Sequence, residues 1–252
     1  MKKLLLLLLF MTSFLEAQTV EQLFENANKL YQENKFEEAI KVYEEIEAQG
    51  AISSALYYNI GNAYYKLNKV APTIYNFEKA LQLDPLNEDA RNNLIFSKRL
   101  TLDKIEEVPQ SFLQKINKNY LQKLSYNQWA IVIVVFSFLG AILFLLFYFS
   151  DVPWRKRLFF TTSIISFILL IAAVIITINQ YDLEKNTIEA IVFAEVVEVK
   201  NEPLSSSSEA FTLHEGTKVF VLDEVDNWKK IKLADGKIGW ILSEKIKTLN
   251  NF

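Results

Sequence analysis

Two long apolar runs dominate the pattern of hydrophobic and polar positions along the chain. Residues 130–149 and residues 158–178 carry no charged side chain. At a rise of about 1.5 Å per residue, each run forms a helix about 30 Å long, which matches the hydrocarbon core of a bilayer. We therefore predict transmembrane helices over residues 127–149 and 158–178, joined by a turn. A pair of core helices in a soluble protein is the alternative, but such helices usually keep a polar face.

The N-terminus carries the pattern of a secretory signal. Lys2 and Lys3 precede an apolar run over residues 4–14, and Ala17 supplies a small residue at a plausible cleavage point. The apolar run is too short to span a bilayer as a helix. We predict a signal peptide over residues 1–17.

Export of the N-terminus sets the expected topology. It places the turn over residues 150–157 in the cytoplasm, with Arg155, Lys156 and Arg157, and Pro153 is expected to end helical geometry there. Basic residues also flank the first span on the outer side, so the signal peptide decides the orientation. The prediction is a bacterial inner-membrane protein with two spans and both soluble domains in the periplasm.

Between the signal and the first span, the chain repeats itself with a period of 34 residues. At this shift small positions meet small ones, and large apolar positions meet large apolar ones. Such a period with helical spacing inside it is typical of tetratricopeptide repeats. The second copy resembles the consensus of that family through Tyr57, Ile60, Gly61, Tyr64, Phe77, Ala80 and Pro85. We predict an α-helical tetratricopeptide domain over residues 18–101, with two repeats and a capping helix.

The resemblance implies a groove that binds a peptide or protein, lined by the first helix of each repeat. Aromatic side chains in such a groove bury apolar groups of a peptide, and amides satisfy its backbone. The alternative is that some of these aromatic side chains only pack between helices. The family's groove positions fall on Phe24, Asn28, Tyr31, Tyr58, Asn62, Tyr65, Lys66, Asn92 and Phe96.

Two connecting segments flank the spans. Residues 102–126 begin with a polar break and continue with lysines among the polar positions. The apolar residues at helical spacing there are Phe112, Leu113, Ile116, Tyr120, Leu121 and Leu124. This pattern predicts an amphipathic helix beside the membrane, lying either in the headgroup layer or as a solvated linker. Residues 179–188 are expected to form a second linker.

After the spans the pattern changes from helical to short strands. Residues 196–199, 219–222, 228–233 and 238–241 are rich in β-formers, and Asp235-Gly236 is a hairpin-turn signal. The Trp-x-x-Ile strand, Asp-Gly turn and Gly-Trp-Ile strand resemble the bacterial SH3 family. The resemblance implies an all-β, SH3-like barrel over residues 189–252, of a kind that binds cell-wall peptides or other proteins.

The residue inventory offers little for catalysis. The chain has no cysteine and one histidine, His214, which is expected to be an exposed turn residue rather than a base or metal ligand. We find no phosphate-binding glycine loop and no residue set for a zinc site or a serine triad. Both soluble parts are net acidic, which argues against nucleic acid as a partner. We predict a non-enzyme without cofactor or metal.

The order of the parts resembles the BatE group of the aerotolerance operon family. That resemblance implies partners among other membrane-bound Bat-type proteins, including those with von Willebrand-type domains, and a cytoplasmic ATPase of the MoxR type. The predicted function is an inner-membrane scaffold that recruits partners through the groove and the barrel, in an envelope or oxidative-stress complex. The alternative is an envelope sensor whose SH3-like domain binds peptidoglycan peptides.

Overall fold

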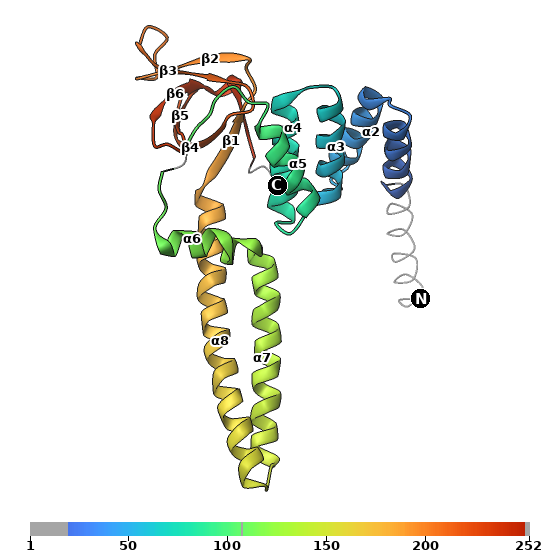
Figure 1. Ribbon diagram of the computed structural model, residues 1–252, viewed down its shortest axis with the longest axis vertical. Helices are drawn as coiled ribbons and strands as arrows, with labels where there is room; N and C mark the ends of the chain where they lie inside the picture. The colour runs from blue at the N-terminus through green and yellow to red at the C-terminus, as the bar shows by residue number, and fades with distance from the viewer. Residues whose placement is uncertain (1–19, 107, 250–252) are drawn as a thin grey trace, which may run out of the picture. The chain divides into compact units, whose positions relative to one another are not determined.

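The structure is a computed structural model that describes residues 20–106 and 108–249 (Figure 1). The predicted signal peptide, residues 1–17, lies outside the described residues. The chain divides into two compact units: the first joins Met1–Val108 to Glu189–Phe252, and the second is Pro109–Ile188. Helical repeats, two long apolar helices and a C-terminal antiparallel sheet confirm the predicted fold class.

The first unit begins with the helical repeats. A helix over residues 20–32 is followed by α2 (Phe36–Ala48), α3 (Ser54–Lys66), α4 (Val70–Leu83) and α5 (Glu88–Lys98). Side-chain caps fix where α3 and α5 begin, because Ser53 and Asn87 each accept a hydrogen bond from a backbone N–H of the first turn. We call this part of the first unit the helical domain.

The 34-residue period is present in the backbone itself. Asn34 and Asn68, one period apart, take φ angles of 60° and 57°. At both places the next backbone N–H, of Lys35 or Lys69, donates to the carbonyl five residues earlier, at 2.9 and 3.0 Å. Asparagine tolerates this left-handed conformation, which satisfies the last carbonyls of the preceding helix.

Close packing of α3 on α4 depends on a glycine, Gly61, as the repeat resemblance implies. A Cβ atom added to Gly61 would lie 2.7 Å from two ring carbons of Phe77, well inside van der Waals contact. Pro72 lies in the first turn of α4, where its lack of an N–H costs nothing, and the helix ends before Pro85.

The C-terminal part of the first unit is a seven-stranded sheet in the order β3-β2-β6-β5-β4-β1-β7. Gly236 of the predicted Asp-Gly turn has a φ of 94° and connects β5 to β6. Val199, Ile231 and Ile241 are fully buried in its core. The strands are β1 (Ile188–Val192), β2 (Val196–Lys200), β3 (Glu209–His214), β4 (Lys218–Val225), β5 (Trp228–Lys232), β6 (Ile238–Leu242) and β7 (Ile246–Thr248).

A segment from before the apolar helices completes this β domain. Ile105 packs against the core of the sheet, and the backbone N–H of Val108 donates to the carbonyl of Ala234 at 3.2 Å. We call residues 101–106 with Val108 the strap. The structure thus differs from the linker expected over residues 102–126, because burial of Ile105 and pairing with Ala234 hold the first residues of that segment on the sheet.

The second unit contains α6 (Phe112–Asn119), a 3-10 turn (Leu121–Lys123), α7 (Tyr126–Phe149) and α8 (Pro153–Asn186). Two helices here, Tyr126–Phe149 and Pro153–Leu183, are long and apolar enough to cross a membrane.

The connections around α8 are shorter than expected. Pro153 does not end helical geometry but begins α8, because proline at the first helical position gives up no hydrogen bond. Arg155, Lys156 and Arg157 therefore lie in the first turns of α8 instead of in the turn expected over residues 150–157. The linker expected over residues 179–188 is also mostly helical, since α8 continues to Asn186.

Small and hydroxyl-bearing residues hold α7 against α8. Ser163 Oγ donates to the carbonyl of Gly140 at 3.2 Å, and Ser166 Oγ donates to the carbonyl of Phe136 at 3.0 Å. Such contacts suit helices in lipid, where close backbone approach and interhelical hydrogen bonds replace the hydrophobic effect. Nearly all other side chains of both helices are at least partly exposed, as expected for a surface facing hydrocarbon.

Candidate interaction site

The nine predicted groove residues lie on three helices that each begin a repeat. The helix over residues 20–32 supplies three of them, α3 supplies four and α5 supplies two. Their surroundings divide them into residues that pack between helices, residues that join successive helices by amide hydrogen bonds, and exposed residues.

Three of the predicted aromatic residues pack between helices. The ring of Phe24 lies 5.9 Å from that of Tyr43, Tyr31 lies 5.3 Å from Phe36, and Tyr58 lies 6.0 Å from Phe77. Burial, with the nearby Tyr58, raises the pKa of the Tyr31 phenol. These residues therefore have a packing role, which the sequence left open as the alternative.

The predicted amides form a repeated bridge between successive helices. Asn59 Nδ2 donates to Asn28 Oδ1 at 3.0 Å, and Asn93 Nδ2 donates to Asn62 Oδ1 at 2.8 Å. Both donors and both acceptors are one 34-residue period apart, so this is one contact made twice. Asn59 and Asn93 were not among the predicted residues, although the same period in the sequence would have found them. Tyr43 Oη also donates to Asn28 Oδ1, at 2.6 Å.

The remaining four predicted residues are exposed. Tyr65 and Phe96 keep 42% and 54% of their surface accessible, and Lys66 and Asn92 are exposed as well. The Asn62–Asn93 bridge joins α3 to α5 one helical turn before Tyr65 and Phe96, so it brings the two aromatic side chains toward one surface. We call Tyr65, Lys66, Asn92 and Phe96 the exposed face.

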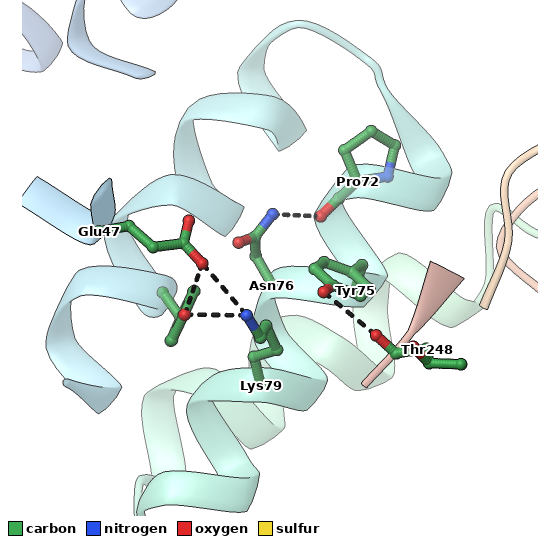
Figure 2. A network of polar contacts seen from close by, with 7 residues as sticks. Glu47, Pro72, Tyr75, Asn76, Lys79 and Thr248 are labelled. Carbon is green, nitrogen blue, oxygen red and sulfur yellow. Dashed lines mark hydrogen bonds and ion pairs between the residues drawn. The ribbon is translucent and has the colours of Figure 1, made fainter. Parts of the chain in front are cut away.

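The middle of α4, in contrast, is buried on all its faces and offers no exposed surface. Residues 73–80 are all buried, and four of them are polar or charged: Thr73, Asn76, Glu78 and Lys79. A buried polar group without a partner costs about 1–3 kcal/mol, so each needs one. Thr73 Oγ1 donates to the Lys69 carbonyl at 2.6 Å, and Asn76 Nδ2 donates to the Pro72 carbonyl at 2.8 Å (Figure 2).

Lys79 is the buried cation of this helix. Its Nζ lies 3.2 Å from Glu47 Oε1 and donates to Tyr57 Oη at 2.8 Å, while Tyr57 donates to the same carboxylate oxygen at 2.7 Å. Figure 2 shows Glu47 of α2 reaching Lys79 of α4. Burial lowers the pKa of Lys79 and raises that of Tyr57. The network ties α2, α3 and α4 together.

The same helix contacts the last strand of the β domain. Tyr75 Oη donates to the carbonyl of Thr248 at 3.3 Å (Figure 2). The ring of Tyr75 lies 5.6 Å from Phe193 in an edge-on arrangement, and Lys247 Nζ lies 4.6 Å from its centroid. An aromatic pair and a cation over a ring face are each worth about 1 kcal/mol.

Glu78 is the buried anion, and its partners come from both domains. Lys98 Nζ of α5 lies 2.8 Å from one carboxylate oxygen, and Lys218 Nζ of β4 lies 2.9 Å from the other. Lys218 is shared with Glu189 of β1 at 2.7 Å. Burial opposes ionisation of Glu78, but the attraction of Lys218 and Lys98 prevails and lowers its pKa to about 2. We call these four residues the interdomain ion cluster.

Gly216 allows the β domain to approach α4. It takes a φ of 82° in the turn before β4, and a Cβ atom there would lie 3.0 Å from side-chain carbons of Val70, Ile74 and Thr101. Beside it, the Glu215 carboxylate accepts a weak hydrogen bond from the backbone N–H of Ala71 at 3.4 Å. A negative charge at this helix N-terminus is favourable, because the first N–H groups have no intrahelical partner.

His214 joins the strap to the β domain and is not the exposed turn residue expected from the sequence. Its Nδ1 lies 2.7 Å from Asp103 Oδ1, and its backbone N–H donates to Asp103 Oδ2 at 2.7 Å. Thr217 Oγ1 donates to the same oxygen at 2.6 Å. Burial would raise the pKa of Asp103, but the hydrogen bonds from Thr217 and His214 lower it. The one histidine of the chain thus fixes the strap.

Comparisons with protein families agree with the helical domain and the β domain. Residues 54–87 match the tetratricopeptide repeat model, and residues 195–247 match the model of the bacterial SH3 domain. A search of curated proteins finds no match. The chain therefore combines two modules that are typical of protein interaction rather than of catalysis. Among residues 20–106 and 108–249, no group of three or more His, Asp or Glu residues is placed to hold a metal ion.

The interdomain ion cluster predicts a large loss of stability for Lys218→Met. The substitution leaves Glu78 buried with one cation fewer, and breaking a buried ion pair in this way typically costs about 3–5 kcal/mol. Denaturant unfolding of the detergent-solubilised chain, followed by tryptophan fluorescence, measures the change. Lys237→Met is the matched control, because Lys237 pairs with Asp235 on the surface and such pairs contribute at most about 1 kcal/mol. A loss no greater than that of the control would contradict this role for Lys218.

The lowered pKa of Glu78 predicts sensitivity to acid. A carboxylate whose pKa falls from 4.5 to about 2 on folding stabilises the fold above pH 4.5, and this stabilisation is lost as the pH falls toward 2. The shift corresponds to roughly 3 kcal/mol. The free energy of unfolding, measured at steps between pH 5 and pH 2, should fall more steeply for the natural chain than for Glu78→Gln. Parallel slopes would show that Glu78 does not titrate differently on folding.

Proposed function

We propose that the chain is a membrane-anchored scaffold that recruits a partner protein through the exposed face of its helical domain. The observation that carries the proposal is the burial of residues 73–80, the middle of α4, on every face. The β domain packs against α4, the second helix of the second repeat. Accessible residues remain on the helices that begin each repeat: Tyr65, Lys66, Asn92 and Phe96. Aromatic residues beside polar ones are the usual anchors of a protein-binding surface.

The apolar hairpin supplies the anchor in this proposal, and the first unit supports a common side for both soluble domains. Asp103 precedes the hairpin and His214 follows it, yet the two residues are hydrogen-bonded. Two spans would return the chain to the side from which it came. We place that side in the periplasm of a bacterial inner membrane, because of the signal-like N-terminus and the basic residues Arg155, Lys156 and Arg157 at the other end of the hairpin.

The order of domains supports a place in a Bat-type envelope or oxidative-stress complex. The partners would then be other membrane Bat-type proteins, including those with von Willebrand-type domains. This assignment rests on the arrangement of modules, since each module alone occurs in many kinds of protein.

Loss of the exposed face should weaken partner recruitment without unfolding the chain. We expect Tyr65→Ala combined with Phe96→Ala to reduce co-purification of the partner from detergent-solubilised membranes at least tenfold, since two aromatic anchors are commonly worth more than about 2 kcal/mol together. Both side chains are about half exposed, so circular dichroism should not change. Tyr58 and Asn62 are unsuitable for this test, because Tyr58 packs on Phe77 and Asn62 accepts a hydrogen bond from Asn93.

Leu86→Ala is the matched control, because Leu86 is an apolar residue with 48% exposure on the turn between α4 and α5. It should leave recruitment unchanged. If the double variant also retains its partner, recruitment does not use the exposed face.

The absence of cysteine makes the topology directly measurable. Ser206→Cys lies in the exposed loop between β2 and β3, and Asp151→Cys lies between α7 and α8. A membrane-impermeant maleimide should label the cysteine at position 206 in intact spheroplasts, and the cysteine at position 151 only after lysis. The opposite pattern would place both soluble domains in the cytoplasm.

An envelope sensor that binds peptidoglycan peptides remains the second candidate, and one surface of the sheet favours it. Trp240 of β6 pairs across strands with Lys200 and Lys230, and Lys230 Nζ lies 5.8 Å from its ring. An aromatic ring between two cations suits a peptide that carries carboxylates. Sedimentation of the whole chain with isolated cell wall separates this candidate from the scaffold. The β domain alone is unsuitable, because it would lack the strap.

A further inference from the structure

The segment over residues 111–129, which we call the elbow, contains two helix starts with the same capping motif. Ser111 Oγ accepts from the backbone N–H of Gln114 at 3.3 Å, and Gln114 Oε1 accepts from the backbone N–H of Ser111 at 2.8 Å. Ser125 and Gln128 repeat this reciprocal pair at the start of α7, at 3.2 and 3.0 Å. Each capping box satisfies two otherwise unpaired backbone donors. The capping residues therefore fix where α6 and α7 begin, and with them the break between the two helices.

A side-chain hydrogen bond holds the elbow closed. The indole N–H of Trp129, in the first turn of α7, donates to the carbonyl of Leu121 in the 3-10 turn at 2.9 Å. Figure 1 shows α6 lying across the direction of α7. A helix held crosswise at the end of an apolar helix lies parallel to a membrane surface when that apolar helix crosses the membrane.

The side chains of α6 are distributed as such a position requires. Phe112 and Ile116 are four residues apart and so share one side of α6, and Tyr120 follows as the residue at its C-terminal cap. Phe112 is 77% exposed and Tyr120 is 67% exposed. Lys115 and Lys123 are exposed as well.

We propose that α6 and the 3-10 turn bind the surface of a bilayer that contains anionic phospholipids. Phe112 and Tyr120 enter the headgroup layer, and Lys115 and Lys123 contact lipid phosphates. The occupant is lipid rather than a protein because this face adjoins the start of α7, whose exposed apolar surface requires hydrocarbon, and because the exposed charges are positive. Each lysine near an anionic surface is attracted to it. The inference rests on the proposed function in one respect, that α7 and α8 cross a membrane.

Spin labels on single cysteines test the proposal in the full chain, since no natural cysteine interferes. The positions are Phe112→Cys, Gln114→Cys on the opposite side of α6, and Ile142→Cys in the middle of α7. Gln114→Cys keeps the bond from its backbone N–H to Ser111 Oγ. In nanodiscs of phosphatidylethanolamine and phosphatidylglycerol, we compare the accessibility of each label to oxygen, which enters lipid, with its accessibility to a water-soluble nickel complex.

We expect the ratio of oxygen to nickel accessibility to be severalfold higher at position 112 than at position 114, and highest at position 142. Adding Lys115→Glu and Lys123→Glu should lower the ratio at position 112 and leave position 142 unchanged. A lipid signal at 142 with equal, aqueous signals at 112 and 114 overturns the binding of α6 to lipid but leaves the anchor intact. Aqueous signals at all three positions overturn the membrane anchor as well.

Discussion

A charged carboxylate inside a protein is tolerated only where cations surround it, and that constraint determines how the soluble domains of this chain fit together. Glu78 lies on a helix that is buried on all sides, and one of its two cations belongs to the β domain. The helical domain alone would leave one carboxylate oxygen of Glu78 without Lys218, and the β domain alone would leave Lys218 with Glu189 only. Each domain therefore leaves a charged side chain with fewer ion-pair partners when the other domain is absent.

The apolar contacts between the domains are consistent with this dependence. Ile74 and Val70 meet the backbone at Gly216, and Tyr75 packs on Phe193. Contacts of this kind add burial but carry little specificity, because many apolar surfaces would serve equally well. The ion cluster and the Tyr75–Thr248 hydrogen bond fix the register, since each requires one particular arrangement of donor and acceptor.

The elements themselves could be predicted from the sequence because their signals are local or periodic. The 34-residue period, the Asp-Gly turn and the uncharged runs each depend on residues close in sequence or regularly spaced. The contacts between domains could not be predicted in this way. Glu78 pairs with Lys218 across 140 positions and Asp103 with His214 across 111, and no spacing rule connects such residues. His214 was misjudged for this reason, because its partner lies on a distant segment.

The helices that carry the candidate residues could be predicted to a similar extent, but the exposure of those residues could not. The repeat pattern indicates which helix faces outward but does not separate exposed from packed positions on that face. Tyr58 and Tyr65 are both aromatic residues of α3, yet Tyr58 packs on Phe77 and Tyr65 is exposed. The difference depends on side chains supplied by the next helix. The two ends of α8 were predicted wrongly for another reason. Proline and polar residues permit helix as well as loop, so the helix begins at Pro153 and continues through residues 179–186.

The strap makes the β domain discontinuous in sequence, and this has a consequence for biogenesis. Its two portions are separated by α6, α7 and α8, so the ribosome delivers the strap well before the first strand. The sheet reaches its final form only when the second portion has been made and has joined the strap. If α7 and α8 cross a membrane, as we propose, a chain that inserted only one of them would leave Asp103 and His214 in different compartments, and the β domain would lack its strap. In the proposed topology, folding of the first unit would therefore depend on the insertion of both helices.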